Sequence, residues 1–319
     1  MQIFGNDIRF GVHSGQQNTS FDEYRDLWVR SEELGYDWVS DFDHFRPIMS
    51  DPTGPQFEGP TALAAMAERT SRVRCGMLVL GVTYRHPAVV ANIAATIDHV
   101  SGGRLELGMG AAWFELEHEQ YGIPFPRIGV RMDMLDEACH ILRSLWTRET
   151  TTFEGKHFQL KDARLEPKPV QERLPLVIGG SGERRTLRIV AEHADIWNGF
   201  YGDLEHYRHL LDVLGQHCAD VGRDPADIRK SLTFRAVVAD SEQEAEERLQ
   251  EIWGGPPPER MRAMTTVGTV DQCIEGLRPY ADLGVGDFLL GSMHPHDWQS
   301  VELVANTVAP AVKAAVASR

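Results

Sequence analysis

A carboxylate beside an imidazole is the first pair of residues in this chain that could do chemistry. Asp43 and His44 stand in the run 41–45, directly after residues 37–40, in which Trp38 and Val39 are apolar. Such a run predicts a buried strand that opens into a loop at the pair. An imidazole ordinarily titrates near neutral pH, so a histidine there can donate or accept a proton. The alternative is structural, with Asp43 capping the loop and His44 packing as a hydrogen-bonded residue.

Composition narrows the classes of protein to consider. The 319 residues are 42% hydrophobic and 25% charged, which is typical of a globular chain. A net charge of −15 without a Lys/Arg cluster argues against nucleic acid and anionic lipid as partners. Four scattered cysteines predict free thiols in a reducing compartment. With no basic-then-apolar leader and no apolar run of about 18 residues, we expect a soluble, cytoplasmic protein.

The elements that must position Asp43 and His44 follow an alternating pattern. Short apolar runs alternate with amphipathic stretches, as in βα units around a parallel sheet. A hairpin at 151–165 interrupts the pattern, the loops 46–60 and 254–265 are long, and Pro310 should interrupt the terminal helix. No interdomain linker is visible. We therefore predict an α/β fold, a (β/α)8 TIM barrel with insertions, as a single domain over residues 1–319. The expected strands are 8–12, 38–42, 73–81, 104–110, 176–178, 194–197, 232–238 and 287–290.

Several short motifs follow one another along the chain: residues 35–40 leading into 43–45, 84–89, 102–104 with 107–110, 174–182, and 268–269. Their order and spacing resemble the luciferase-like monooxygenase superfamily, whose bacterial luciferase-like barrels bind reduced flavin or coenzyme F420. The stretch 110–118, with Trp113 and His118, looks most like the F420-associated branch.

The resemblance implies a cofactor site for coenzyme F420, or alternatively FMN. A ring system needs a flat apolar slot, and its phosphate tail needs an anion site. The turn after residue 178 can present free N–H groups to a phosphate, although it could be an ordinary glycine turn. The implied cofactor residues are Asp43, Met77, Leu78, Gly108, Met109, Gly110, Ala111, Gly179, Gly180, Ser181 and Gly182.

The glycines of the fourth expected strand and the arginines after the glycine turn can each be given a cofactor-binding or a purely structural role. Gly108 and Gly110 would let a ring approach the backbone, or would serve tight sheet packing. The family's non-proline cis peptide bond is expected between Met77 and Leu78. The basic residues after the glycine turn, Arg184, Arg185 and Arg188, would meet a phosphate or an anionic tail, or form a solvated helix face.

By resemblance, His44 is the predicted catalytic residue. Some F420-dependent dehydrogenases of the family carry a glutamate where this chain has Ala111, which argues against sugar-phosphate dehydrogenation. The expected substrate side is His13, Trp113, Trp197 and Asn198, with core packing as the alternative for the two tryptophans.

The predicted function is F420-dependent hydride transfer to or from a small organic substrate, by a homodimer as is usual in the family. The alternative is an FMNH2-dependent monooxygenase using the same pocket. A metal-dependent hydrolase, suggested by His294 and His296 with His13 and His44, fits poorly because such barrels carry the HxH pair at strand one. A catalytically silent flavin-binding barrel is the remaining possibility. No residue is predicted to hold a metal.

Overall fold

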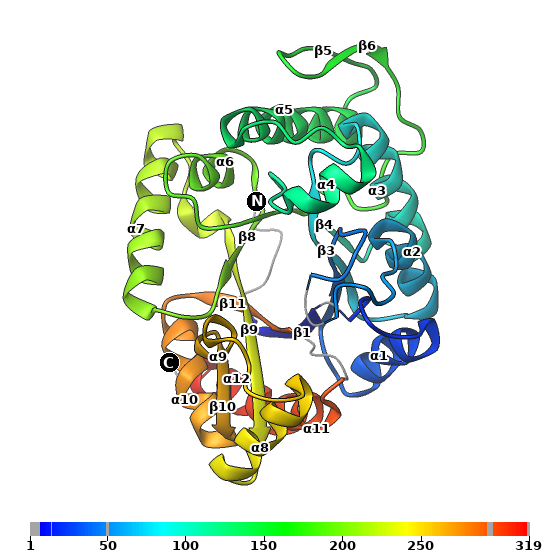
Figure 1. Ribbon diagram of the computed structural model, residues 1–319. Helices are drawn as coiled ribbons and strands as arrows, with labels where there is room; N and C mark the ends of the chain where they lie inside the picture. Colours follow the sequence, from blue (N-terminus) through cyan, green and yellow to red (C-terminus); the bar gives the residue numbers. More distant parts are fainter. Residues whose placement is uncertain (1–6, 14, 49–50, 292–295, 318–319) are drawn as a thin grey trace.

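The described part of this computed structural model covers residues 7–13, 15–48, 51–291 and 296–317. Eight parallel strands in it close into a barrel, because β9 pairs with both β8 and β11 and β11 pairs with β1. Figure 1 shows the barrel inside a ring of helices. This confirms the predicted (β/α)8 architecture with its eight strands. The barrel strands are β1 (Arg9–His13), β2 (Trp38–Asp41), β3 (Arg74–Gly81), β4 (Leu105–Gly110), β7 (Leu176–Gly179), β8 (Ile196–Phe200), β9 (Arg229–Ala239) and β11 (Val285–Gly291).

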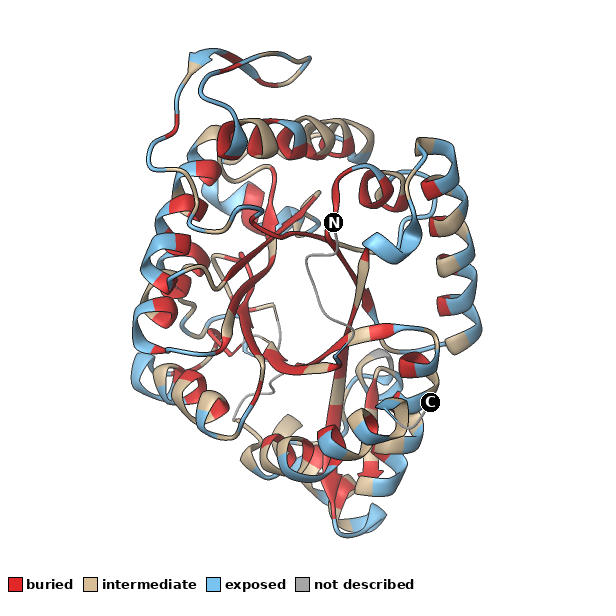
Figure 2. Ribbon diagram, turned by 180° about the vertical axis from the view of Figure 1, so that it is seen from behind, coloured by how far each residue is buried: buried red, intermediate tan, exposed pale blue. Residues whose placement is uncertain are grey.

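The outer helices start largely where capping chemistry predicts. The first, α1, begins after Ser20, which forms a capping box with Glu23. Figure 2 shows buried residues on the strands and on the inward faces of the helices. The surrounding helices are α1 (Phe21–Glu33), α2 (Gly59–Arg69), α3 (Pro87–Ser101), α5 (Ile128–Thr147), α6 (Thr186–His193), α7 (Leu204–Val221), α8 (Glu242–Trp253), α10 (Val270–Asp282), α11 (Trp298–Leu303) and α12 (Ala309–Ala317).

Insertions extend the barrel at several points. The predicted hairpin is present as an antiparallel pair that projects beyond the helix ring (Figure 1). Two elements in the expected loop 254–265 and beyond were not predicted: a short helix and a strand that pairs with the second half of β9. A short helix after β4 was also missed. These elements are α4 (Glu115–Tyr121), β5 (Thr151–Glu154), β6 (Gln159–Ala163), η1 (Pro225–Asp227), α9 (Glu259–Ala263) and β10 (Thr265–Thr269).

The terminal helical segment Trp298–Ala317 is long and apolar enough, by length and composition alone, to span a membrane. The expectation that no such stretch exists was therefore wrong. Four valines of the segment are nevertheless buried in the main hydrophobic core, as in a barrel helix: Val301, Val304, Val308 and Val312. Just before Pro310 the helix widens into a π-helical turn, η2 (Val304–Val308), which accommodates the missing proline N–H.

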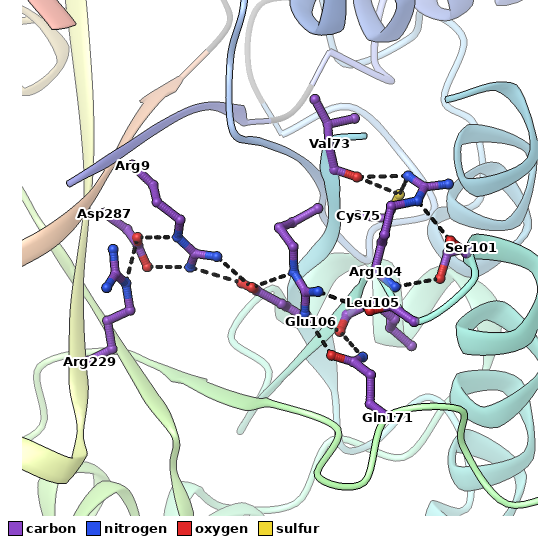
Figure 3. Close-up of polar contacts among 12 residues, drawn as sticks. Arg9, Val73, Cys75, Ser101, Arg104, Leu105, Glu106, Gln171, Arg229 and Asp287 are labelled. Atoms are coloured by element: carbon purple, nitrogen blue, oxygen red, sulfur yellow. Dashed lines mark hydrogen bonds and ion pairs between the residues drawn. The ribbon is translucent and has the colours of Figure 1, made fainter. Parts of the chain in front are cut away.

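A layer of charged residues fills the barrel at the amino ends of its strands (Figure 3). Arg9 contacts both carboxylates of the layer, with 2.7 Å from Nε to Asp287 Oδ1 and 2.7 Å from Nη1 to Glu106 Oε1. Arg74 and Arg229 complete the pairing. Burial alone would raise the pKa of Asp287, but Arg9 and Arg229 lower it below its ordinary value. This paired layer closes one end of the barrel, so a ligand site belongs at the other end.

Candidate active site

His44 lies at the carboxyl end of β2, in the predicted position, and is buried. Its Nδ1 atom is 2.6 Å from Oε1 of Glu117 on α4. An ionised carboxylate can only accept a hydrogen bond, so Nδ1 carries the proton. The other ring nitrogen, Nε2, makes no hydrogen bond to any residue in the described ranges. The structure therefore orients His44 with one nitrogen fixed and the other available to a ligand.

Glu117 is the centre of this arrangement and was missed by sequence reasoning. Besides His44, it accepts hydrogen bonds from the Phe45 backbone N–H, at 2.9 Å, and from the Tyr84 hydroxyl. Burial would raise the pKa of Glu117, but the hydrogen bond and charge of His44, with the bonds from Tyr84 and Phe45, lower it. Burial and Glu117 in turn raise the pKa of Tyr84. A buried, ionised carboxylate thus stands behind the imidazole.

Aromatic rings enclose the imidazole of His44. Phe42 and Trp113 approach it edge-on, with centroid distances of 5.2 and 5.5 Å. Trp113 also stacks on Phe114 at 5.1 Å, yet the Trp113 side chain is 61% exposed. It follows Ala112, whose positive φ of 59° turns the chain at the end of β4. An exposed indole beside a buried histidine provides an apolar wall that a planar ligand can contact.

Asp43 does not point its carboxylate at an open site. Its side chain accepts from the Gly81 backbone N–H at 3.1 Å and from Arg85, at 2.8 Å to Oδ2. Arg85 also pairs with Glu58. Burial raises the pKa of Asp43, and Arg85 only partly opposes that shift. The carboxylate joins the loop after β2 to the end of β3, so its side chain positions the loop and only the loop backbone remains for a ligand.

The bulge in β3 differs by one residue from the prediction. The non-proline cis peptide bond joins Leu78 and Val79, not Met77 and Leu78. Leu78 faces the barrel interior, packed in a cluster with Trp38 and Leu289, whereas the Met77 and Met109 side chains are buried in the main core between sheet and helices. Direct contact of those two methionine side chains with an interior ligand is therefore not supported.

Gly108 and Gly110 face Val79. A Cβ atom added at Gly108 would lie 2.1 Å from the Met77 carbonyl oxygen, and one added at Gly110 would lie 2.5 Å from Val79 Cγ2. These glycines accommodate the β3 bulge, which favours the packing alternative for them. Ala111, the next residue, packs against the main core, and its carbonyl accepts from Arg131 Nε at 3.0 Å.

The turn from Gly179 to Gly182 lies between β7 and α6. Gly180 has φ of 118°, which strains any L side chain, and a Cβ at Gly182 would meet Thr186 Oγ1 at 2.7 Å. No side chain caps α6, whereas Ser20, Asp203 and similar residues cap other helices. The Leu187 N–H already donates to the Gly182 carbonyl, at 3.0 Å, so it is the N–H groups before Leu187 that can bind an anion at this uncapped start. Ser181 is exposed beside it.

The three arginines after this turn differ in whether they have an ion-pair partner. Arg185 pairs with Asp133, and Arg188 pairs with Glu192. Arg184 is exposed and makes no hydrogen bond or ion pair with any part of the chain that the structure describes. Two of the three are thus committed to the helix surface, as the alternative interpretation held, and Arg184 remains available to an anion.

His13, at the end of β1 beside β2, and Asn198, on β8 beside β7, face the barrel interior. His13 Nδ1 lies 3.0 Å from Ser40 Oγ, and Asn198 donates to Ser231 and Thr233. Burial, with a smaller effect of Arg235, lowers the pKa of His13 to about 3, so it is neutral at physiological pH.

Trp197 does not share this side of the strand. Its ring stacks on Tyr207 of α7 at 5.4 Å, and its Nε1 donates to the Gly180 carbonyl. It therefore supports the glycine turn from outside the barrel, in agreement with the packing alternative.

Arg235, on β9, is a further residue that sequence reasoning missed. It lies close enough to His13 to lower its pKa, and its own pKa is lowered by burial. In the described ranges no carboxylate pairs with it. A half-buried guanidinium without a counter-ion is available to an anionic group of a ligand.

Within the residues that the structure describes, the histidines considered as ligands of a metal-dependent hydrolase do not form a metal site. His294 and Pro295 lie outside those residues. Within the described ranges, the one group of three His, Cys, Asp or Glu side chains close enough to share a metal is Asp136, His140 and His193, which does not include His13 or His44.

Asp41, two residues before Asp43, makes the protein's stability depend on pH. It is fully buried, accepts a hydrogen bond from Tyr24, and has no partner at Oδ2 among the described residues. Burial raises its pKa to about 8. A raised carboxyl pKa stabilises the fold fully below the unfolded value near 4, and this stabilisation is lost as the pH rises through about 8.

We expect Asp41→Asn to flatten this pH dependence, because the amide stays neutral and still accepts from Tyr24. Between pH 5 and 8 the free energy of unfolding of the unmodified protein should fall, relative to the variant, by about 1 kcal/mol per pH unit. Urea unfolding at several pH values measures this difference. Asp26→Asn, at an exposed position of α1, is the control, and parallel curves for all three proteins would contradict the prediction.

Several known proteins are similar to this chain in sequence or in structure. An F420-dependent glucose-6-phosphate dehydrogenase of Microbacterium testaceum is 29% identical over 306 residues, 87% of this chain and 89% of that protein. An F420-dependent secondary alcohol dehydrogenase, solved with an F420-acetone adduct, has a TM-score of 0.84 at 20% identity, covering 96% of this chain and 99% of that one. The oxygenating constituent of 3,6-diketocamphane monooxygenase of Pseudomonas putida, solved with FMN, has a TM-score of 0.75 at 18% identity over 95% and 98%.

The two structural likenesses show the shared barrel fold, while the sequence pattern identifies the family. The pattern of the luciferase-like monooxygenase family matches residues 7–287, which include the loop of His44, the glycine turn and seven of the eight barrel strands in full. The chain belongs to the luciferase-like monooxygenase family.

Proposed function

We propose that this protein is an F420-dependent oxidoreductase that catalyses hydride transfer between C5 of the deazaflavin and a small organic substrate. The observation that carries the proposal is the His44–Glu117 pair: Nδ1 is held by a carboxylate and Nε2 is free at the carboxyl end of the barrel. The F420-dependent relatives support the choice of cofactor.

The residues present fit such a cofactor. The glycine turn and the uncapped start of α6 offer backbone N–H groups to a phosphate, with Ser181 and Arg184 beside them. Leu78 and Val79 form an apolar floor inside the barrel, and Trp113 supplies an exposed aromatic wall. When bound, the deazaflavin supplies or accepts the hydride.

The chain's own contribution would be proton transfer. Hydride transfer to a carbonyl carbon must be accompanied by a proton to its oxygen, and His44 Nε2 can donate that proton as imidazolium or accept it in the reverse direction. Glu117 keeps the proton on Nδ1 and stabilises the cationic ring. With Ala111 at the position of the family's second glutamate, we assign proton transfer to His44 alone.

The proposal also covers the substrate side of the site, the domain organisation, the oligomeric state and the location. Asn198, neutral His13 and Arg235 would form the substrate side, and Arg235 favours substrates with an anionic group. We also propose one domain over residues 1–319, a homodimer and a cytoplasmic location, by resemblance to the family. Light scattering after gel filtration tests the dimer.

Anaerobic titration of the purified protein with F420 and separately with FMN, each oxidised and reduced, tests the function by fluorescence. We expect tight binding of F420 and weak binding of FMN, followed by F420-dependent turnover in a screen of alcohols, ketones and unsaturated acids. Preference for FMNH2 with O2 consumption would instead support a flavin monooxygenase, the activity of the FMN-bound neighbour. Binding of neither cofactor would overturn both assignments.

A further inference from the structure

We propose that Asp136, His140 and His193 form a zinc site on the outside of the barrel, where α5 meets the carboxyl end of α6. Each side chain offers one ligand atom, and these atoms all lie within 4.8 Å of one another. The proposal stands apart from the cofactor site and from the function proposed above.

The ligand types suit zinc. Imidazole nitrogen and carboxylate oxygen are ordinary zinc ligands, and two histidines with one acid form a three-ligand set that leaves a fourth position for water or a further side chain. Hard cations such as Mg²⁺ prefer sites made of oxygen ligands alone. The site therefore favours Zn²⁺ over Mg²⁺.

The backbone already brings the ligands together. Asp136 and His140 are four residues apart on α5 and so lie on one face of that helix. His193, the last residue of α6, is buried, and its Nε2 lies 2.8 Å from Asp136 Oδ1. Two of the three ligand atoms are thus already neighbours, and zinc would replace the proton shared between them and move them slightly apart.

His140 completes the set. Its ring centroid is 4.4 Å from that of His193, at an interplanar angle of 80°. In the part of the chain that is described, neither nitrogen of His140 forms a hydrogen bond, and the residue is exposed. Bond lengths of about 2.1 Å place tetrahedral zinc ligands roughly 3.4 Å apart. An exposed side chain can make the small rotation needed to close the site.

Glu192 offers a fourth ligand. Its Oε2 atom lies 3.8 Å from His193 Nε2, although its Oε1 atom pairs with Arg188. At the other end of α6, Arg185 pairs with Asp133, one turn before Asp136 on α5. A zinc ion at the carboxyl end of α6 would therefore add a second link between α6 and the same stretch of α5.

Zinc binding to the full-length protein, with any polyhistidine tag removed and after dialysis against EDTA, tests the proposal. We expect calorimetric titration with ZnCl2 to give about one ion per chain, and no binding of Mg²⁺. At a large excess over the dissociation constant, zinc should raise the midpoint of thermal unfolding by about 4 °C.

The variant His140→Asn should weaken zinc binding by at least about tenfold, and Asp136→Asn should do the same. His140 is exposed, so its replacement should leave the fold intact, which circular dichroism checks. His206→Asn, at an exposed histidine of α7, is the matched control and should bind like the unmodified protein. Absence of zinc binding, unchanged binding by His140→Asn, or an equal loss in His206→Asn would overturn the site.

Discussion

Replacing His44 with asparagine is expected to lower kcat by roughly 100-fold or more, because the variant has no group that titrates at the position of Nε2. Asparagine can still donate a hydrogen bond to Glu117, so the buried carboxylate keeps a partner. Affinity for F420 should stay within about threefold, since His44 is proposed to act on the substrate's proton and not to hold the cofactor. Stopped-flow absorbance of F420 with a substrate from the screen, and fluorescence titration for affinity, measure the two quantities.

The control for this variant is His206→Asn, which changes a histidine on the surface of α7 and should leave both quantities unchanged. Turnover by His44→Asn at the rate of the unmodified protein would show that His44 is a packing residue after all. A large loss of F420 affinity with little change in kcat would instead place His44 in cofactor binding.

The fold could be predicted from the sequence because its signals are local. Buried parallel strands appear as short apolar runs, and capping residues such as Ser20 mark where helices begin. All eight barrel strands were found in this way. The strand β10 was missed because Thr265–Thr269 contains one large apolar residue and pairs only with the far half of β9.

The directions of side chains were harder to predict. Barrel strands are buried on both faces, so hydrophobicity does not say which face is the interior. Alternation along a strand does separate neighbours: Trp197 and Asn198 cannot both face inward, and the polar residue does. The same rule places Met109 outside while Gly108 and Gly110 face the bulge. The alternation along a strand therefore carries a signal in the sequence for which side chains face inward.

No local pattern in the sequence predicts which distant residues contact His44, Asp43 and His13. Glu117 lies more than 70 positions after His44 and meets it only because α4 folds over the end of β2. Arg85 and Arg235 likewise act on residues of other strands: Arg85 follows β3, which pairs with β2, and Arg235 lies on β9, which is separated from β1 by β11. The helix α4 has seven residues, too few for a clear amphipathic pattern.

Glu117 provides the second prediction of large effect, as a positioning residue that acts through His44. Glu117→Gln should keep most of the shape of the site, because the glutamine oxygen can accept from His44 and Tyr84, while the bond from the Phe45 N–H is lost. It removes the negative charge that favours the imidazolium form. We therefore expect kcat to fall roughly tenfold to 100-fold at neutral pH and the ionisation that governs turnover to move to lower pH.

The pH profile separates this role from a purely structural one. A loss of packing would lower kcat at every pH and reduce stability without moving the profile, whereas loss of the charge moves it. Glu117→Asp, which keeps the charge on a shorter side chain, should restore the position of the profile and part of the rate. Glu119→Gln, exposed on the same helix, should change neither. If Glu117→Gln kept the original profile, the carboxylate would be a structural partner of Phe45 and Tyr84, and the proton on His44 would be set by the ligand alone.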